Sequence, residues 1–355
     1  MSGFAQKIIY WYSDNKRDLP WRKLSDPYPI WLSEIILQQT RVDQGLPYFQ
    51  KFFGKYPNVH YLADAEEQDV LRLWQGLGYY SRARNMHAAA KFISQELGGK
   101  FPNTFKEIKK LKGVGDYTAA AIASFAFNEK VAVVDGNVYR VLSRRFGVSE
   151  DISSPKGKRV FQELADSLLP EKQSEIYNQG IMEFGALHCK PKSPDCMFCV
   201  FSLECEARKA GNQSSLPVKS KNVKVKTRFF NYLIFEYKDQ IVMKERLKGD
   251  IWQGLYDFPL IDSENFYTGE DLFAQSKIPL NAIKEDVLHY KISDLYKHIL
   301  THQKIQAKFF YLRLNNDKNI DIFCEEYGFK LYSINEIENL PKPILIDNYL
   351  KEHVF

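Results

Sequence analysis

The sequence predicts two domains in one chain of 355 residues, an all-α first domain followed by an α+β second domain. Apolar residues in the first part recur at helical spacing, without an alternating strand pattern. From 210 to 228 the composition changes to Gly, Asn, Gln, Ser, Pro and Lys, which is typical of a linker. Strand-like runs then follow at 229–236, 241–243 and 306–312. We therefore expect domains at 1–209 and 229–355, joined by a linker at 210–228.

The overall composition is that of a folded protein outside the membrane. Hydrophobic residues make up 45% of the chain and charged residues 26%, so extensive disorder is not expected. The chain has no apolar run of about 18 residues, which a membrane-spanning helix needs, and its N-terminus lacks the apolar core of a signal peptide. These features predict a cytoplasmic location.

The net charge of +5 is distributed unevenly along the chain. Residues 1–213 carry 29 Lys and Arg against 24 Asp and Glu, residues 219–228 carry five bases and no acid, and residues 229–355 carry 15 bases against 20 acids. An excess of positive charge indicates that the first part and the linker face a polyanion. A solvated charge imbalance without a function would look the same.

The first candidate acid lies on a predicted helix near the N-terminus. An amphipathic helix at 4–18 should end before Pro20, and the next helix should follow Pro29. That second helix carries Glu34 among Trp31, Ile35, Ile36 and Leu37. Apolar surroundings would raise the pKa of this carboxyl and keep it protonated. The alternative is an exposed acid near the positive end of the helix.

Three segments have the residue types that contact nucleic acid. Gln38-Gln39-Thr40-Arg41 has amide and hydroxyl groups suited to base edges, and 73–85 combines two glycines, two adjacent tyrosines and arginines. The Gly113-Val114-Gly115 turn, just before a helix, can present backbone N–H groups to a phosphate. A polar helix end, aromatic packing and a plain helix–helix turn explain the same letters separately.

A second candidate acid, Asp135, follows the strand-like run 131–134. It precedes Gly136-Asn137, the place of a residue that caps a helix, and capping is the commoner function of such an aspartate. Further helices are predicted near 153–169 and 175–187, and the latter carries Glu183.

Four of the five cysteines form a C-x6-C-x2-C-x5-C array: Cys189, Cys196, Cys199 and Cys205. Four thiolates within seventeen residues can enclose an iron–sulfur cluster or a zinc ion, although zinc sites usually have two paired C-x2-C units. Cys324 stands apart and is expected to be buried. In the second domain, 298–302 has the residues of a reading loop, although two structural histidines beside a strand are equally compatible with it.

Seven blocks of the chain, in order, resemble the MutY family of adenine DNA glycosylases, within the helix-hairpin-helix glycosylases. They are LPWR at 19–22, SEIILQQTRV at 33–42, LWQGLGYYSRARN at 73–85, LKGVGDYTAA at 111–120, VVDGNVYRV at 133–141, MEFGALHC at 182–189 and the four-cysteine array. The resemblance covers nearly all of 1–205. It implies removal of adenine that is mispaired with 8-oxoguanine or guanine in double-stranded DNA, by a nucleoid-associated monomer.

The resemblance also implies roles for individual residues. Glu34 matches the general acid, Asp135 the carboxylate that stabilises the positive sugar, and Tyr117 and Asn137 their neighbours. Gly113, Val114 and Gly115 match the DNA-backbone contact, and the four cysteines match the ligands of one 4Fe-4S cluster. The substrate-binding residues it implies are Trp21, Arg22, Leu37, Gln39, Thr40, Tyr80, Glu183, Leu300, Thr301 and His302.

Two alternative functions can be compared with the sequence. An endonuclease III-like lyase needs a lysine two residues after the GVG turn, for a Schiff base, but Tyr117 occupies that position. A DNA-binding protein without catalysis would be expected to lack one of the two carboxylates, and both are present.

The second domain resembles the Nudix-like domain of the same family, most clearly in KGDIWQGLYDFP at 248–259. A Nudix hydrolase needs an Arg-Glu-x-x-Glu-Glu helix soon after this segment, yet no arginine occurs between Arg246 and Arg313, so no pyrophosphohydrolase activity is expected. The family reads 8-oxoguanine through a Phe-Ser-His loop, to which Leu300, Thr301 and His302 correspond. Leucine cannot stack on a base as phenylalanine does.

Overall fold

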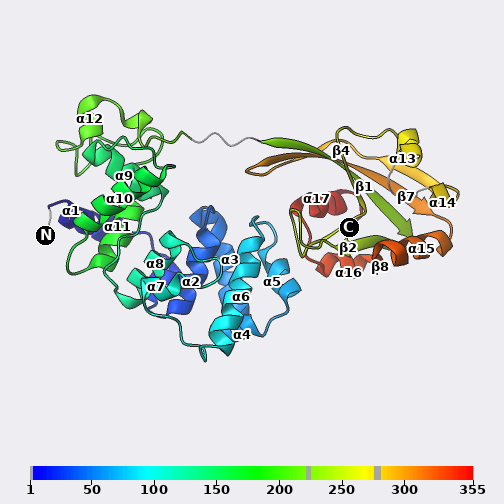
Figure 1. The fold of residues 1–355 in the computed structure, drawn as a ribbon, viewed down its shortest axis with the longest axis horizontal. Helices are drawn as coiled ribbons and strands as arrows, with labels where there is room; N and C mark the ends of the chain where they lie inside the picture. The colour runs from blue at the N-terminus through cyan, green and yellow to red at the C-terminus, as the bar shows by residue number, and fades with distance from the viewer. Residues whose placement is uncertain (1–2, 221–224, 276–280, 355) are drawn as a thin grey trace. The chain divides into compact units, whose positions relative to one another are not determined.

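The computed structural model describes residues 3–220, 225–275 and 281–354. The chain divides into two compact units, Met1–Asp64 with Asn85–Lys221 and Ala65–Arg84 with Asn222–Phe355. The first unit is helical, and the second contains the β-sheet (Figure 1). Since 65–84 group with the second unit, the two units are not separated by a single cut in the linker. The predicted boundaries at 209 and 229 stay predictions.

The first unit consists of helices joined by turns and longer loops. They are α1 (Gly3–Asn15), η1 (Pro20–Lys23), α2 (Pro27–Leu37), α3 (Val42–Lys55), α4 (Val59–Ala63), α7 (Phe105–Ile108), α8 (Asp116–Phe127), α9 (Gly136–Phe146), α10 (Pro155–Leu168), α11 (Ser174–Leu187), α12 (Glu206–Ala210) and η2 (Gln213–Ser215). Helix α6 (Ser81–Gln95) crosses the division between the units, and α5 (Glu67–Trp74) belongs to the second. Both helices predicted after Asp135 agree with α10 and α11 to within two residues.

Helix α11 is the centre of one core, with α1 and α9 against it. Close approach depends on two glycines. A Cβ on Gly180 would lie 2.9 Å from Ile8 Cγ2 in α1, and a Cβ on Gly185 would lie 2.7 Å from Asn137 Cβ in α9. Larger side chains would therefore separate the helices that carry the candidate site.

The strand-like run 131–134 forms no strand, so this part of the sequence prediction is wrong. The segment is extended, but a side chain takes the place of a neighbouring strand. Asn178 of α11 accepts a hydrogen bond from Val133 N at 3.2 Å and donates one to Val131 O at 2.9 Å. Its amide thus satisfies both kinds of backbone group in a buried segment, as buried polar groups require.

Part of the predicted linker is packed rather than extended. Arg144 Nε donates to Leu216 O, Ile152 N donates to Val218 O, and the Ser220 hydroxyl bonds to Asp151. The first unit therefore holds the chain as far as Ser220. Residues 221–224 of the predicted linker lie outside the described residues.

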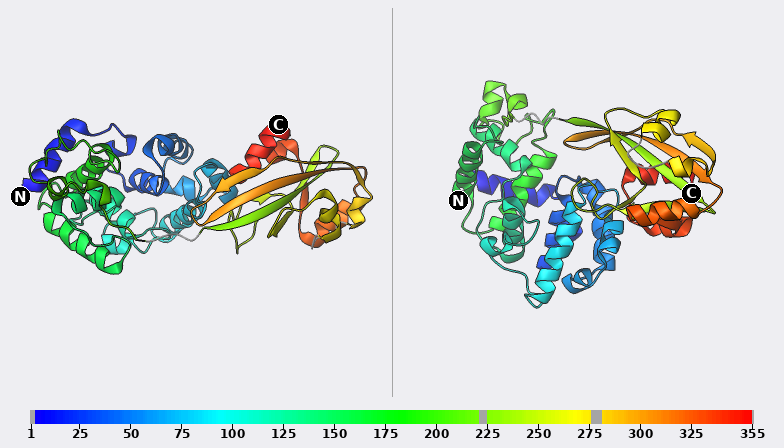
Figure 2. Two further views of the ribbon diagram at one scale, coloured as in Figure 1. Left: turned by 90° about the horizontal axis from the view of Figure 1, so that it is seen from above. Right: turned by 45° about the vertical axis from the view of Figure 1, so that its right-hand side comes forward.

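The second unit contains an eight-stranded sheet with the order β3-β2-β1-β7-β5 along its main path. The strands are β1 (Lys226–Tyr237), β2 (Gln240–Glu245), β3 (Tyr256–Asp257), β4 (Leu260–Ser263), β5 (Val287–Ile292), β6 (Tyr296–Ile299), β7 (Gln303–Leu314) and β8 (Lys330–Ser333). Strands β1 and β7 are parallel and lie side by side in both views of Figure 2. The predicted β1–β2 hairpin is confirmed by the antiparallel pair Glu236↔Ile241.

Alternate residues of β1 and β7 face two layers of helices. Leu233 and Phe310 join a core with α15 (Lys318–Tyr327) and with Leu272 of α13 (Gly269–Gln275) and Ile283 of α14 (Asn281–Lys284). On the other face, Phe309 stacks on Tyr349 of α17 (Ile344–His353) with ring centroids 4.1 Å apart. Helix α16 (Ile334–Asn339) follows β8.

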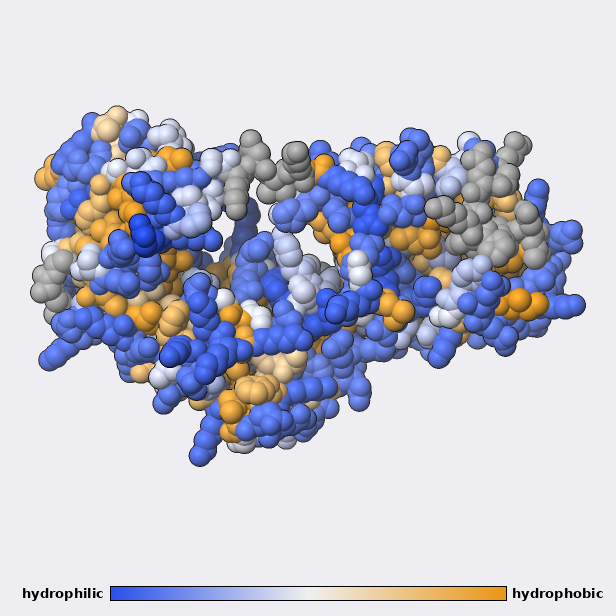
Figure 3. Space-filling model, viewed as in Figure 1, coloured by the Kyte–Doolittle hydropathy of each residue, from blue (hydrophilic) through white to orange (hydrophobic). Residues whose placement is uncertain are grey.

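The viewed surface is largely hydrophilic (Figure 3). No helix among the described residues is long and apolar enough to cross a membrane. Cys324 is buried, as its sequence context predicted.

Candidate active site

The candidate site is a cavity of about 540 Å³ in the first unit. Its walls come from η1, α2, α3, α8, α9 and α11, elements that span much of the first unit's sequence. Glu34, Tyr117, Asp135 and Asn137 all line it. The fold thus brings together the four residues that the sequence resemblance assigns to catalysis.

Glu34 is placed by a helix that is buried almost all round. Nine of the eleven residues of α2 are buried, and the Glu34 side chain is 7% exposed. Burial raises the pKa of Glu34 from its usual 4.5 to about 7, because the charged form loses its solvation. The structure agrees with the prediction of an apolar environment and not with the exposed alternative.

Tyr117 is the residue in hydrogen-bond contact with Glu34. It lies in the first turn of α8, and its hydroxyl donates to Glu34 Oε2 at 2.8 Å. Burial raises the pKa of Tyr117 well above its usual range, so the hydroxyl keeps its proton. This bond favours ionised Glu34 and opposes the effect of burial on the pKa of Glu34.

Asp135 caps helix α9, as its sequence position predicted, and it also faces the cavity. Its Oδ1 accepts from Val138 N at 2.7 Å, and its Oδ2 accepts from Asn137 Nδ2 at 2.7 Å. Burial raises the pKa of Asp135 from its usual value, while these hydrogen bonds lower it. Capping and a role in the cavity are therefore compatible.

Asn137 is itself oriented by Arg140 one turn later in α9. Arg140 Nη2 donates to Asn137 Oδ1 at 2.7 Å and to Gly185 O at 2.8 Å, and its Nε donates to Cys189 O at 2.7 Å. Arg140 is 8% exposed. A buried guanidinium therefore fixes the amide that binds Asp135.

A second group of charges lines the cavity around Glu183. Arg17 and Arg22 each donate two hydrogen bonds from the guanidinium to this carboxylate, at 2.7–3.0 Å. Burial alone would raise the pKa of Glu183, but these bonds lower it to about 2. Trp21 lines the same cavity and is buried.

Sequence reasoning missed Arg17 and Gln179, which both line the cavity. Arg17 stands two residues before the LPWR block, in a Lys16-Arg17 pair that looks like the solvated end of a helix. A buried acid such as Glu183 needs a cation beside it, and this requirement was the one feature of the sequence that could have pointed to Arg17.

The polar turn after α2 contributes unequally to the cavity. Leu37 and Thr40 line it, and Gln38 Nε2 donates to Thr118 Oγ1 in α8 at 3.0 Å. Gln39 does not line the cavity and has a positive φ of 55°. A left-handed backbone is uncommon for glutamine.

The Gly113-Val114-Gly115 turn lies directly before α8. Gly113 has φ +81°, and a Cβ there would lie 2.7 Å from Asn85 Cβ, so this position requires glycine. Val114 is buried, and Gly115 is the N-cap residue of α8. The first N–H groups of a twelve-residue helix therefore begin at the turn.

The four cysteines line one small cavity beside α9. None of the four forms a disulfide, and three receive hydrogen bonds. Arg144 Nη1 donates to Cys189 Sγ at 3.5 Å, Phe201 N to Cys199 Sγ at 3.4 Å and Gln213 Nε2 to Cys196 Sγ at 3.9 Å. In the described part of the chain, no three Cys, His, Asp or Glu side chains are placed to hold a single metal ion.

The remaining predicted residues lie in the second unit. Tyr80 is buried, and its hydroxyl donates to Lys342 O at 3.4 Å, while its neighbour Tyr79 is 45% exposed. Thr301 and His302 are exposed in the turn between β6 and β7. The hydroxyl groups of Tyr79 and Thr301 hydrogen bond to each other, so the tyrosine turn and the candidate reading loop meet within this unit.

Comparisons with known proteins match both parts of the chain. Residues 32–168 match the family described as HhH-GPD superfamily base excision DNA repair protein, and residues 231–352 match the NUDIX domain. Among solved structures, a thermostable thymine-DNA glycosylase is 31% identical, covers 58% of this chain and 95% of its own, and has a TM-score of 0.54. An endonuclease III–DNA complex, 22% identical with a TM-score of 0.51 over 59% of this chain and 94% of its own, supports the fold alone. The predicted fold class is confirmed.

Curated relatives extend the match to the whole chain. An adenine DNA glycosylase of Buchnera aphidicola subsp. Schizaphis graminum is 32% identical over 348 residues, which is 96% of either chain. The human adenine DNA glycosylase is 39% identical over 225 residues, 61% of this chain and 41% of that one. Since the first of these relatives matches through both domains, this chain belongs to the adenine DNA glycosylase family, with a helical domain of the base-excision superfamily and a Nudix-like second domain.

Proposed function

We propose that the protein removes adenine opposite 8-oxoguanine or guanine in double-stranded DNA by hydrolysis, without strong lyase activity. The observation that carries this proposal is the single cavity lined by Glu34, Tyr117 and Asp135. Glycosidic bond cleavage needs a proton for the leaving group and a fixed anion near the sugar, and two carboxyl groups can divide these tasks.

Glu34 is the proposed general acid. Its pKa of about 7 keeps a proton available near neutral pH, where an ordinary glutamic acid would have lost it. The acid donates this proton to N7 of adenine, and the electron pair of the breaking N9–C1′ bond moves onto the base. General acid catalysis of this kind supplies about 10²–10⁴-fold in rate.

Asp135 is the proposed anion that stabilises the positively charged sugar. The Val138 N–H and the Asn137 amide hold its carboxylate, and the positive end of α9 favours its ionised form. Ionised Glu34 then takes a proton from the attacking water. The same acid is regenerated, so the cycle closes on this chain's own groups.

The adenine pocket is proposed around Glu183. Trp21, Arg22, Leu37 and Arg17 line the cavity beside it and present both apolar and charged surfaces. Thr40 and Gln39 are the proposed contacts with the DNA stack, from which the target base must be extruded at a cost of a few kcal/mol. Tyr80, expected from the sequence to contact the stack, is buried, so its exposed neighbour Tyr79 is the proposed contact from that turn. The 113–115 turn is the proposed backbone contact, where N–H groups meet a phosphate without reading sequence.

The residue at position 117 supports a route without lyase chemistry. A lyase forms a Schiff base through an amine, which tyrosine cannot supply. Among the described residues that line the cavity, none is a lysine. Both carboxylates come from one chain, which supports action as a monomer.

The four thiols fit one 4Fe-4S cluster better than a single ion. Each thiolate of such a cluster ligates a different iron, so its sulfurs lie farther apart than the ligands of one zinc ion. All four cysteines line one cavity, and N–H groups are directed at three of their sulfurs, as is typical of cluster ligands. Cys189, Cys196, Cys199 and Cys205 would hold the cluster, which orders the loop beside α9.

The 300–302 loop is proposed to recognise 8-oxoguanine. Thr301 offers a hydroxyl and His302 a ring nitrogen, both exposed, in place of the Ser-His pair of the family loop. Leu300 offers apolar contact instead of a ring. We propose no pyrophosphohydrolase activity for this domain.

Single-turnover base release tests the function. Duplexes containing A opposite 8-oxoguanine, A opposite G, and thymine glycol separate the adenine activity from the endonuclease III-like activity. We expect release from both adenine duplexes, loss of release in Glu34→Gln, and little borohydride-trapped protein–DNA adduct. No release from either adenine duplex overturns the proposal, and native release by Glu34→Gln overturns the assigned acid.

A further inference from the structure

Arg228 lies beside the candidate reading loop, although the sequence places it at the end of the linker. It belongs to β1, which runs parallel to β7. The backbone fixes both ends of the loop, because Leu300 N donates to Gln303 O at 2.8 Å and Lys226 N donates to His302 O at 3.0 Å. Between these bonds, Thr301 and His302 remain exposed.

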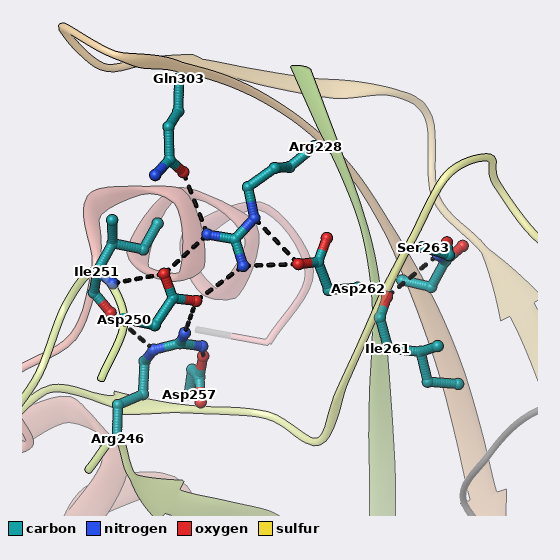
Figure 4. Close-up of polar contacts among 10 residues, drawn as sticks. Arg228, Arg246, Asp250, Ile251, Asp257, Ile261, Asp262, Ser263 and Gln303 are labelled. Carbon is teal, nitrogen blue, oxygen red and sulfur yellow. Dashed lines mark hydrogen bonds and ion pairs between the residues drawn. The ribbon is translucent and has the colours of Figure 1, made fainter. Parts of the chain in front are cut away.

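The Arg228 guanidinium joins three segments around this loop (Figure 4). It makes two bonds to Asp250, at 2.7 and 2.8 Å, and two to Asp262 Oδ2, at 2.7 and 3.0 Å. A fifth bond runs from Nη1 to Gln303 Oε1 at 3.1 Å. The Arg228 side chain is 11% exposed, so Gln303, the residue directly after His302, is bound by a cation that is largely shielded from solvent.

A second arginine extends the network behind the first. Arg246 donates to Asp250 Oδ2 at 2.9 Å, to buried Asp257 at 2.6 Å and to Ile251 O at 2.9 Å. The segment so anchored carries Trp252, whose ring centroid lies 5.7 Å from that of His298, just before the loop. The network therefore reaches both flanks of the loop.

The contacts depend on the shape of the guanidinium as well as on its charge. Arginine presents five N–H donors in a planar fork, and Arg228 makes five hydrogen bonds. Without it, Asp262 would lose this cation and Gln303 its donor, while Asp250 would keep its bond to Arg246. The Asp262 carboxylate would then repel the DNA that the loop approaches.

We propose that Arg228 is a positioning residue for recognition of the base opposite adenine, because it fixes Gln303 and thereby the direction of Thr301 and His302. This inference rests on the proposed function of the 300–302 loop. Arg228 itself does not contact the base.

The test compares Arg228→Met and Gln303→Ala with the native protein. The readout is the preference, the ratio of single-turnover excision rates opposite 8-oxoguanine and opposite guanine below saturation. We expect the ratio to fall about tenfold in each variant, which corresponds to one hydrogen bond of ordinary strength. The double variant should fall no further than Arg228→Met alone, because both changes remove the same contact.

Arg313→Met is the matched control, since Arg313 pairs with Glu236 near the other end of β7. It should keep the native ratio, which would show that losing an arginine–carboxylate pair elsewhere in the sheet is not sufficient to lower the preference for 8-oxoguanine. A native ratio in Arg228→Met overturns the positioning role, as does an equal loss on both substrates that tracks a lower Tm. A native protein without any preference overturns the proposed reading function and this inference together.

Discussion

Replacing Tyr117 by phenylalanine tests how the cavity sets the proton affinity of Glu34. The hydroxyl donates to Glu34 Oε2 at 2.8 Å and stabilises the ionised form. In the proposed mechanism excision requires protonated Glu34, so the native rate should fall as pH rises through about 7. Removing the donor should raise the pKa of Glu34 further and move this basic limb of the pH–rate profile to higher pH.

The size of the shift follows from the bond that is lost. A hydrogen bond to a charged group contributes about 1.5–3 kcal/mol, and one pKa unit corresponds to about 1.4 kcal/mol. The basic limb should therefore move upward by about 1–2 pH units. At pH 8.5, about 3% of native Glu34 would be protonated, against roughly a quarter to three quarters in the variant.

Single-turnover excision from an A:G duplex between pH 5 and 10 measures the shift. Each rate is divided by the same protein's plateau, which separates proton affinity from any loss of geometry. Tyr139→Phe is the matched control, because Tyr139 packs edge-on against Phe161 with centroids 5.1 Å apart and should leave the limb in place. A limb that stays at the native pH or moves downward would refute the reasoning.

Three further outcomes are expected. Glu34→Gln should abolish excision yet raise the free energy of unfolding by on the order of 3 kcal/mol above pH 7. This gain should vanish below about pH 4.5, where Glu34 is protonated in both the folded and the unfolded protein. Urea unfolding at pH 4 and pH 8 measures the difference. Gly185→Ala should cut the excision rate at least tenfold with DNA affinity retained, because its Cβ would lie 2.7 Å from Asn137 Cβ, whereas Gly54→Ala, with open space around it, should be neutral. Purified protein should contain about four iron atoms per chain, and Cys199→Ser should lose both the iron and the cluster's visible absorbance; an iron-free native protein that excises normally would contradict the cluster.

The sequence predicted those features that depend on local pattern. The periodicity of apolar residues predicts helices α10 and α11 and the β1–β2 hairpin. The aspartate at position 135, just before a helix, predicts the cap. Burial of Glu34 could be predicted for the same reason, because its neighbours along α2 are apolar. Each of these depends on residues within a few positions of one another.

Features that depend on distant residues could not be read in this way. The run 131–134 has strand-like residues, but whether it pairs with a strand was decided by Asn178, more than forty positions later. Arg17 looks like a solvated helix end until Glu183 comes beside it. The assignment of 65–84 to the second unit likewise depends on tertiary contacts. In each case long-range contacts decide what local preference does not.

Glu34 and Asp135, which both line the cavity, differ mainly in how many donors reach them. Burial raises the pKa of both Glu34 and Asp135. Glu34, in the body of α2, receives one bond from Tyr117, whereas Asp135, at the start of α9, receives bonds from Val138 N and from the amide of Asn137. Donors at a helix N-terminus favour the anion, whereas the one donor to Glu34 offsets only part of the cost of burial. In the proposed mechanism similar side chains thus serve as an acid and an anion, and we expect that division of roles to depend on Arg140, which donates to Asn137 and keeps its amide directed at Asp135.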